Sequence, residues 1–241
     1  MTDDVLDDTS EDQGKWLKTL DRALAIQQRV VERNVDRVRR SRPEAIPAEL
    51  IGALEKAYTA TVTATGAGAG AAAAAPGVGT PVALALGAGE AGVFLEATAL
   101  FALSVASVHG VRVDDVERRR TLVLAVVLGD AGFMTVQRMA GRTGAHWGKK
   151  LTQKIPIEAI RAANRVLGRN FITRYGTRQG IIVLGRLAPF GIGAAIGAGA
   201  NAAIGWGVVR TTRRVFGPPP PLPVEAGDAP VRPDGVRDHD A

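Results

Sequence analysis

Apolar residues recur along most of this chain at the three- and four-residue spacing of an α-helix. From Lys15 onward they form one stripe, at Trp16, Leu20, Leu24, Val31, Val35 and Val38. Arginines surround this stripe, which is typical of an amphipathic helix with one buried face. Because proline disfavours helical geometry in the residue before it, we expect this helix to end before Pro43.

Two more helices are predicted on either side of a low-complexity bend. The first begins at Pro47, since proline fits the first helical turn. The run TGAGAGAAAAAPGVGT, at 65–80, is expected to form the bend. The second helix begins at Thr80 as its N-cap, with proline following, and runs to about His109, where Gly110 ends it.

The second half of the chain has the same helical spacing. Asp114 and Asp115 start a helix, because acidic side chains favour the positive end of the helix dipole. We expect this helix to continue through the apolar run 121–136, interrupted by Asp130. A later stripe comprises Ile157, Ile160, Ala163, Val166 and Leu167. No segment shows the alternation of a strand, so the sequence predicts an all-α bundle of long, Gly/Ala-rich helices.

An uncharged run, LAPFGIGAAIGAGANAAIGWGVV, occupies 187–209 and is followed by arginines. A helix of this length can cross a hydrocarbon core of about 30 Å. Small residues four apart let helices approach closely, in membranes especially, so we predict a glycine-zipper seam. It lies in a membrane-inserted hairpin or a soluble bundle, packed against the helix from Pro81. Its columns are Gly191, Ala195, Gly199, Ala203 and Gly207, and Gly193, Gly197 and Gly205, with Asn201 among the expected helix-packing residues.

Composition limits the kinds of partner and the cellular compartment that we expect for this protein. The chain has 241 residues, a formal net charge of +6 and no cysteine, which favours an anionic partner and excludes disulfide and thiolate chemistry. The start MTDDVLDDTSEDQ lacks the basic and apolar parts of a signal peptide, so we expect the cytoplasmic side of the cell membrane, or the cytoplasm. We predict a disordered acidic tail at 1–13, one helical domain at 14–216 and a disordered Pro-rich tail at 217–241.

Basic side chains concentrate at 138–178, next to the uncharged run. The segment has few aromatic residues to stack bases and matches no nucleic-acid module, so nucleic acid is not the expected partner. Anionic membrane lipid is the expected partner, and a solvated helix face is the alternative. The residues expected to contact an anionic surface are Lys149, Lys150, Lys154, Arg161 and Arg165.

Three carboxylates, Glu90, Glu96 and Asp130, interrupt otherwise apolar helices. A buried carboxylate is expensive to ionise unless it is paired, so each is either a proton relay or catalytic acid, or half of a buried salt bridge to the basic segment. We favour the salt bridge. The spacing of Glu90 and Glu96 puts them on different helix faces, which weighs against a hydrolase built on paired carboxylates.

Motifs for cofactors and catalysis are missing from the sequence. The glycine runs at 66–70 and 191–199 follow no strand, as a dinucleotide fingerprint requires, and no phosphate loop ends in GK[ST]. The histidines are scattered without an HExxH motif, and no serine lies in a GxSxG elbow. We therefore expect no cofactor, no metal ion and no catalytic residue.

Several segments resemble those of one family when taken together. They are PGVGTP at 76–81, the apolar helix ending in His109-Gly110, VRVDDVERRR at 111–120, Arg174-Tyr175-Gly176, and PFGIGAAIGAGAN at 189–201. Over roughly residues 45–215 this order resembles the EcsC family of bacterial proteins, with His109 where tyrosine is expected. The family is named for an operon that encodes an ABC transporter linked to secretion. The resemblance implies a helical fold and a location at the membrane, and brings no catalytic residues.

The sequence thus leads to three hypotheses. The first is a non-enzymatic helical protein associated with the cytoplasmic membrane, accessory to a transporter or secretion system. The second is a soluble helical adaptor for a protein partner. The third, which is less favoured, is a hydrolase that uses Glu90, Glu96 or Asp130.

Overall fold

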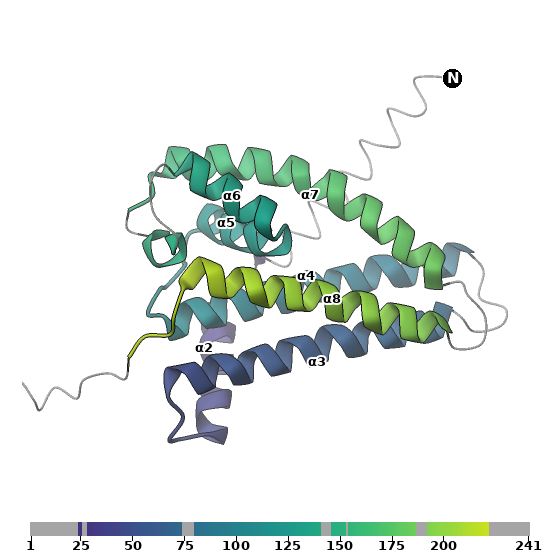
Figure 1. Cartoon of the computed structure of the whole chain (residues 1–241), viewed down its shortest axis with the longest axis horizontal. Coiled ribbons are helices and arrows are strands. Elements are labelled where there is room, and N and C mark those ends of the chain that lie inside the picture. The colour runs from purple at the N-terminus through teal and green to yellow at the C-terminus, as the bar shows by residue number, and fades with distance from the viewer. Residues whose placement is uncertain are drawn as a thin grey trace, which may run out of the picture.

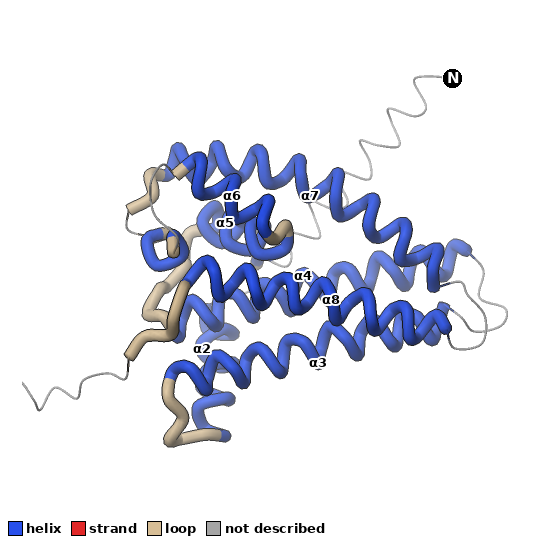
Figure 2. The backbone as a smooth tube through the Cα atoms, viewed as in Figure 1, coloured by secondary structure: helices blue, strands red, loops and turns tan. Residues whose placement is uncertain are grey.

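The computed structural model describes residues 24–25, 28–73, 80–140, 146–152, 154–186 and 192–221 (Figure 1). These residues form seven α-helices and one 3₁₀ turn, and none of them lies in a strand (Figure 2). The elements are α2 (Gln28–Ser41), α3 (Pro47–Ala73), α4 (Thr80–Val108), α5 (Val116–Val127), α6 (Asp130–Met139), η1 (Trp147–Lys150), α7 (Ile157–Arg186) and α8 (Ile192–Phe216). The all-α prediction is confirmed for this part of the chain. The predicted tail at 1–13 lies outside it, as do residues 222–241 of the tail predicted at 217–241, whereas 217–221 are described and follow α8 without forming a helix.

Local sequence signals set most helix ends. Helix α2 ends at Ser41, ahead of Pro43, and α3 begins at Pro47, both as predicted. Gly110 follows α4 with a φ of 73°, a left-handed geometry that glycine adopts without steric penalty. At the start of α5 the Asp115 carboxylate accepts a hydrogen bond from the backbone N–H of Arg118 at 2.9 Å, which satisfies one free donor of the first turn.

Two of the predicted boundaries are wrong. Helix α3 continues to Ala73, so the part of the expected bend at 65–73 is helical. The predicted single helix over 121–136 is two helices, because the backbone turns at Gly129, whose φ is 65°. Asp130 is the first residue of α6, where its charge favours the helix N-terminus instead of interrupting a helix.

Three long helices, α3, α4 and α8, lie side by side, and α7 runs over α5 and α6 (Figure 1). Helix α8 packs principally against α3 and only slightly against α4, so the predicted packing on the helix from Pro81 is wrong in its main partner. The C-terminal parts of α3 and α7 and the N-terminal parts of α4 and α8 meet at one end of the molecule (Figure 1). We call the α3, α4 and α8 segments there, 57–73, 80–89 and 192–209, the arm.

The core lies at the other end, where the shorter helices gather around α4. Leu95 and Ala102 of α4, Leu122 and Leu124 of α5 and Leu167 of α7 are completely buried there. Helix α5 is buried on nearly every side, because α4, α6, α7 and α8 all pack against it. The start of α7 and the end of α8 are anchored in this core, and both helices reach from it to the other end of the molecule (Figure 1).

Candidate functional site

The arm is held together by a close crossing of α3 and α8. A Cβ atom on Gly66 would lie 2.5 Å from the carbonyl oxygen of Gly197 and 2.6 Å from Nδ2 of Asn201, so only glycine fits there. Asn201 is buried, and its Nδ2 donates to the carbonyl of Val62 at 2.9 Å and to Oε1 of Glu90 at 2.6 Å. The amide therefore ties α8 to both α3 and α4.

The expected helix-packing residues divide between two faces of α8. Gly205 faces α3, where a Cβ would lie 2.8 Å from Cγ2 of Val62, and the buried Gly197 and Asn201 share this face. Gly199 is exposed, with open space where its Cβ would be, so its predicted helix contact is wrong. Ala195, Ala203 and Gly207, which belong to the same predicted column as Gly199, are also exposed. Gly191 and the surroundings of Gly193 lie outside the described residues.

The three predicted carboxylates have different environments and do not form one site. Glu90 is buried, as expected, and bonds Asn201 of α8. Glu96 is exposed, so its predicted burial is wrong. Asp130 is also exposed, with 82% of its side chain accessible, and pairs with Arg214 at 2.9 Å. A hydrolase mechanism that combines these carboxylates finds no support in their positions.

A buried carboxylate that the sequence did not predict lies in the N-terminal third of α3. Glu55 is 6% exposed and accepts two hydrogen bonds from Arg213 of α8, at 2.7 Å from Nε and 2.5 Å from Nη2. This two-pronged contact raises the pKa of Arg213. The guanidinium itself is largely exposed, so the pair lies at the protein surface with only its carboxylate buried. The arginines after the uncharged run were the only sequence signal for it.

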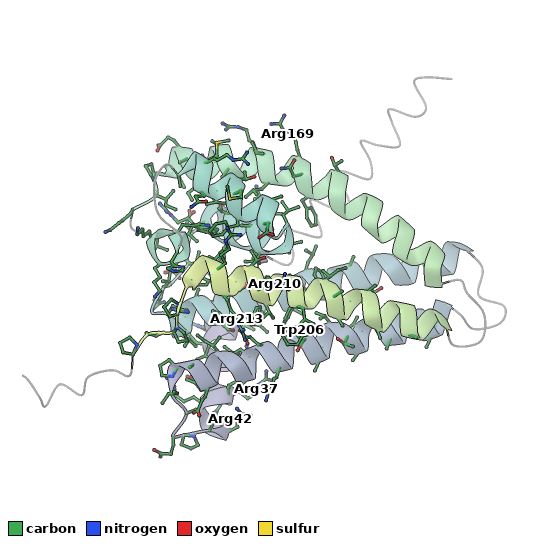
Figure 3. All side chains as sticks on the ribbon, viewed as in Figure 1. Arg37, Arg42, Arg169, Trp206, Arg210 and Arg213 are labelled. Carbon is green, nitrogen blue, oxygen red and sulfur yellow. The ribbon has the colours of Figure 1, made fainter. Side chains whose placement is uncertain are left out.

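The residues expected to meet an anionic surface lie on and just before α7. Lys149 in η1 and Lys154 after it are exposed, and the Lys149 ammonium donates to the carbonyl of Pro218 at 3.3 Å. Lys150 is partly buried. Along α7 the exposed face repeats arginine every four residues, at Arg161, Arg165 and Arg169, and Arg169 points outward (Figure 3).

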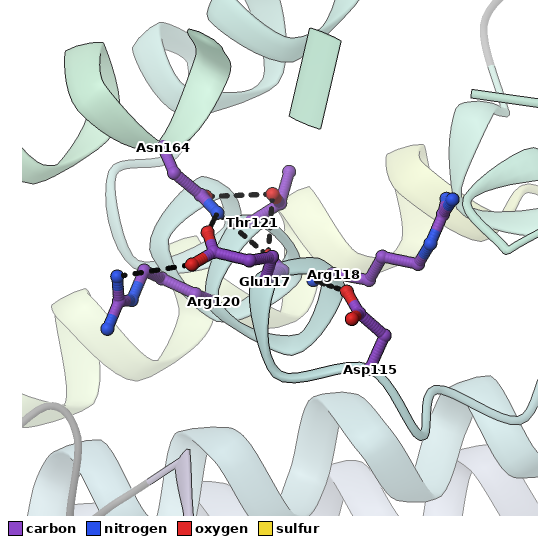
Figure 4. A network of polar contacts seen from close by, with 6 residues as sticks. All are labelled: Asp115, Glu117, Arg118, Arg120, Thr121 and Asn164. Carbon is purple, nitrogen blue, oxygen red and sulfur yellow. Dashed lines mark hydrogen bonds and ion pairs between the residues drawn. The ribbon is translucent and has the colours of Figure 1, made fainter. Parts of the chain in front are cut away.

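Below this face, polar side chains fasten α7 to α5 (Figure 4). The Asn164 amide donates to the backbone carbonyl of Glu117 at 2.9 Å and to its carboxylate at 2.6 Å. Its own oxygen accepts from the Thr121 hydroxyl at 2.8 Å. Because these groups satisfy one another, they hold α7 against α5.

Two histidines meet where α4 and α8 end. His109 stacks on Phe216, with ring centroids 5.2 Å apart. Burial, with the nearby Lys149 ammonium, lowers the pKa of His109 to about 4. His146 places its Nδ1 3.1 Å from the Arg214 carbonyl and packs on Gly217, whose φ of 74° turns the chain away from α8. A Cβ on Gly217 would lie 2.6 Å from the His146 ring, so glycine is required for this contact.

Beside these histidines a cleft of about 540 Å³ opens between α3, α8 and the chain after α8. Its polar lining consists of Glu55, His109, His146, Thr212 and Arg213, and its apolar lining includes Ile51, Val105 and Pro219. Among the described residues no group of three or more His, Asp or Glu side chains gathers to hold a metal ion. Comparisons with protein-family models, curated proteins and solved structures give no match.

Proposed function

We propose that this is a non-catalytic helical protein that attaches to the anionic, cytoplasmic face of a membrane and inserts its arm into the bilayer. The observation that carries the proposal is that the three segments of the arm contain no charged residue, and that the neighbouring Glu90 carboxylate is buried and bonded to Asn201. No Asp, Glu, Lys or Arg occurs in 57–73, 80–89 or 192–209, segments that are remote in sequence and lie at one end of the molecule, which the C-terminal end of α7 also reaches (Figure 1). Charges are expensive in hydrocarbon, so such an end suits a bilayer.

The dimensions and surface of the arm support this proposal. At 1.5 Å per residue, 57–73 extends for about 24 Å, most of a hydrocarbon core of about 30 Å. Its exposed positions include Gly68, Ala71 and Ala195, which are small and uncharged. Asn201 is polar, but its amide is bonded inside the arm, as insertion requires. Within the described residues one stretch, Gly89–Val108 of α4, is long and apolar enough to cross a membrane by itself, but it lies almost wholly outside the arm, in the core.

The arginine face of α7 supplies the attraction to anionic lipid. Arg161, Arg165 and Arg169 project from a helix whose other side is buried, so the three charges are presented together. Each basic residue near an anionic leaflet contributes about 1 kcal/mol to binding at physiological salt. The resemblance to the EcsC family supports, in addition, an accessory role beside a transporter or secretion system.

The insertion of the arm is tested by adding charge to it. The variant Ala71→Glu/Ala195→Glu changes two exposed positions, so the fold should persist while each charge opposes insertion by about 2.5–3.5 kcal/mol. The control Val116→Glu/Met139→Glu adds the same charge at exposed apolar residues outside the arm. Flotation with phosphatidylglycerol vesicles in about 1 M salt, which screens the attraction of the α7 arginines, should recover wild type and control but not the arm variant. Equal flotation of all three proteins refutes insertion.

The role of α7 is tested separately by salt and charge. Arg161→Gln/Arg165→Gln/Arg169→Gln should weaken binding to phosphatidylglycerol vesicles by about 100-fold and make it less dependent on salt. Arg29→Gln/Arg33→Gln/Arg40→Gln removes the same charge from the exposed face of α2 and is the matched control. If the two triple variants weaken binding equally, only net charge matters and α7 is not the contact surface.

A second candidate function is a soluble adaptor for a protein partner. It is favoured by the burial of 61% of the most apolar window of α4 inside the protein, as in a core helix of a soluble bundle. An adaptor would remain in the soluble fraction of lysed cells at low salt without detergent. The membrane proposal requires it in the membrane fraction.

A further inference from the structure

The cleft beside the two histidines is lined by residues near the start of α3 and the end of α8. These helix ends lie opposite the arm (Figure 1). The cleft volume of about 540 Å³ falls within the range of small-molecule sites, about 300–1,000 Å³. The site is also preformed, because the Gly217 turn, capped by its N–H bond to the Arg213 carbonyl at 2.8 Å, holds Pro218 and Pro219 as one wall. Nothing in the membrane proposal uses this cleft.

The charges around the cleft favour an anion. Glu55 and Arg213 largely cancel, and His109 is neutral near pH 7 because its pKa is lowered to about 4. The Lys149 ammonium, bonded to Pro218 at the rim, leaves the balance positive. Since Arg213 is 64% exposed, its guanidinium retains donors that face solvent beyond those given to Glu55.

The opposite part of the lining is apolar. Ile51 and Val105 present aliphatic side chains, and Ala48 and Pro219 complete this side. A ligand that fills the cleft therefore needs an apolar body and one negative group directed toward Arg213 and His146. We propose that the cleft binds a small amphipathic organic monoanion, a carboxylate or sulfonate on an apolar body.

The test uses the full-length protein and two probes. One is 8-anilinonaphthalene-1-sulfonate, which fluoresces when bound in apolar surroundings, and the other is 4-phenylbutyrate, which should displace it. The neutral analogue 4-phenylbutan-1-ol has the same body without the carboxylate. It should displace the dye about 10-fold less well, the value of one charge-assisted contact. Equal displacement by the acid and the alcohol would overturn the assignment of an anion.

A glycine in the wall gives a variant that blocks the cleft without damaging the fold. Gly52 lines the cleft and a Cβ on it meets nothing within 4 Å, so Gly52→Phe adds a large side chain at the cleft wall without a clash, and phenylalanine is the better helix former. Gly168→Phe, at an equally open helical glycine on α7, is the matched control. We expect dye affinity to fall at least about 10-fold in Gly52→Phe and to be retained in Gly168→Phe. Equal affinities would mean that the dye binds elsewhere, and would overturn the proposal.

A further variant, Glu55→Gln, tests whether Arg213 recognises the negative group of the ligand. Glu55→Gln removes the carboxylate that holds Arg213, so the guanidinium becomes free for the ligand. Affinity for 4-phenylbutyrate should then rise by about threefold, whereas affinity for the alcohol should not change. Weaker or unchanged binding of the acid in Glu55→Gln would contradict a role for Arg213 in anion recognition.

Discussion

Replacing Gly66 with alanine should destabilise the protein, although alanine is the better helix former. The added methyl group would lie 2.5 Å from the Gly197 oxygen and 2.6 Å from Nδ2 of Asn201, closer than any real contact. All three of the nearest atoms belong to the α8 backbone or to the Asn201 amide, which is itself bonded to Val62 and Glu90. The clash can be relieved only if α8 moves away from α3.

The magnitude follows from two opposing effects. Alanine gains about 0.8–1.0 kcal/mol over glycine inside a helix. Overpacking a tight contact costs about 1–3 kcal/mol, and each hydrogen bond lost at Asn201 costs about 1 kcal/mol more. The net loss for Gly66→Ala is therefore about 1–3 kcal/mol, or about 2–4 °C of Tm for each kcal/mol in a chain of this size.

A matched control lies two residues further along the same helix. Gly68 is exposed and nothing lies within 4 Å of its would-be Cβ, so Gly68→Ala should stabilise the protein by the helix propensity alone, about 1 kcal/mol. Urea unfolding followed by circular dichroism at 222 nm measures both variants. If Gly66→Ala is as stable as Gly68→Ala, α3 and α8 do not cross at Gly66.

Three further predictions concern single side chains. The pKa of His109, about 4, lies below the unfolded value of 6.5, so stability should fall by about 1–2 kcal/mol, after allowance for solvent screening, as the pH drops from 6.5 to 4. His109→Phe should flatten this dependence in urea midpoints measured against pH. Arg213→Gln leaves the Glu55 carboxylate buried without its partner and should cost about 2 kcal/mol by urea unfolding, much of which Arg213→Gln/Glu55→Gln should restore. Asn164→Ala leaves the Thr121 hydroxyl without one acceptor and should lower stability by about 1–3 kcal/mol in the same assay.

Helix ends were predictable wherever a residue determines its own backbone geometry. Proline after Ser41, proline at the start of α3, glycine after α4 and the Asp115 cap all act through neighbours in the chain. The fate of 65–73 was not predictable in this way. The glycines and alanines of that run are compatible with either a bend or a helix. The segment is helical in the structure, where Gly66 contacts α8, and this contact with a distant part of the chain could not be predicted from local sequence.

The burial of carboxylates was the least predictable feature, because it depends on which distant helices pack over them in the folded protein. Glu96 lies in an apolar helix but on its exposed side, and Asp130 sits at a helix start beside solvent. Glu55 is followed by a lysine and looks like an ordinary surface residue. It is buried because α8 returns along α3 and brings Arg213, from 158 residues away, onto it.

The register of α8 on α3 connects these features. Spacing by four predicted two possible packing columns, and small residues alone do not choose between them, since both have nearly the same shape. The polar pairs distinguish them: Asn201 bonds Val62 at one end of the antiparallel pair, and Arg213 bonds Glu55 at the other. A shift of α8 by one helical turn, about 5.4 Å, would separate both pairs at once. The same register that closes the arm at Gly66 therefore also sets the position of Arg213 at the cleft.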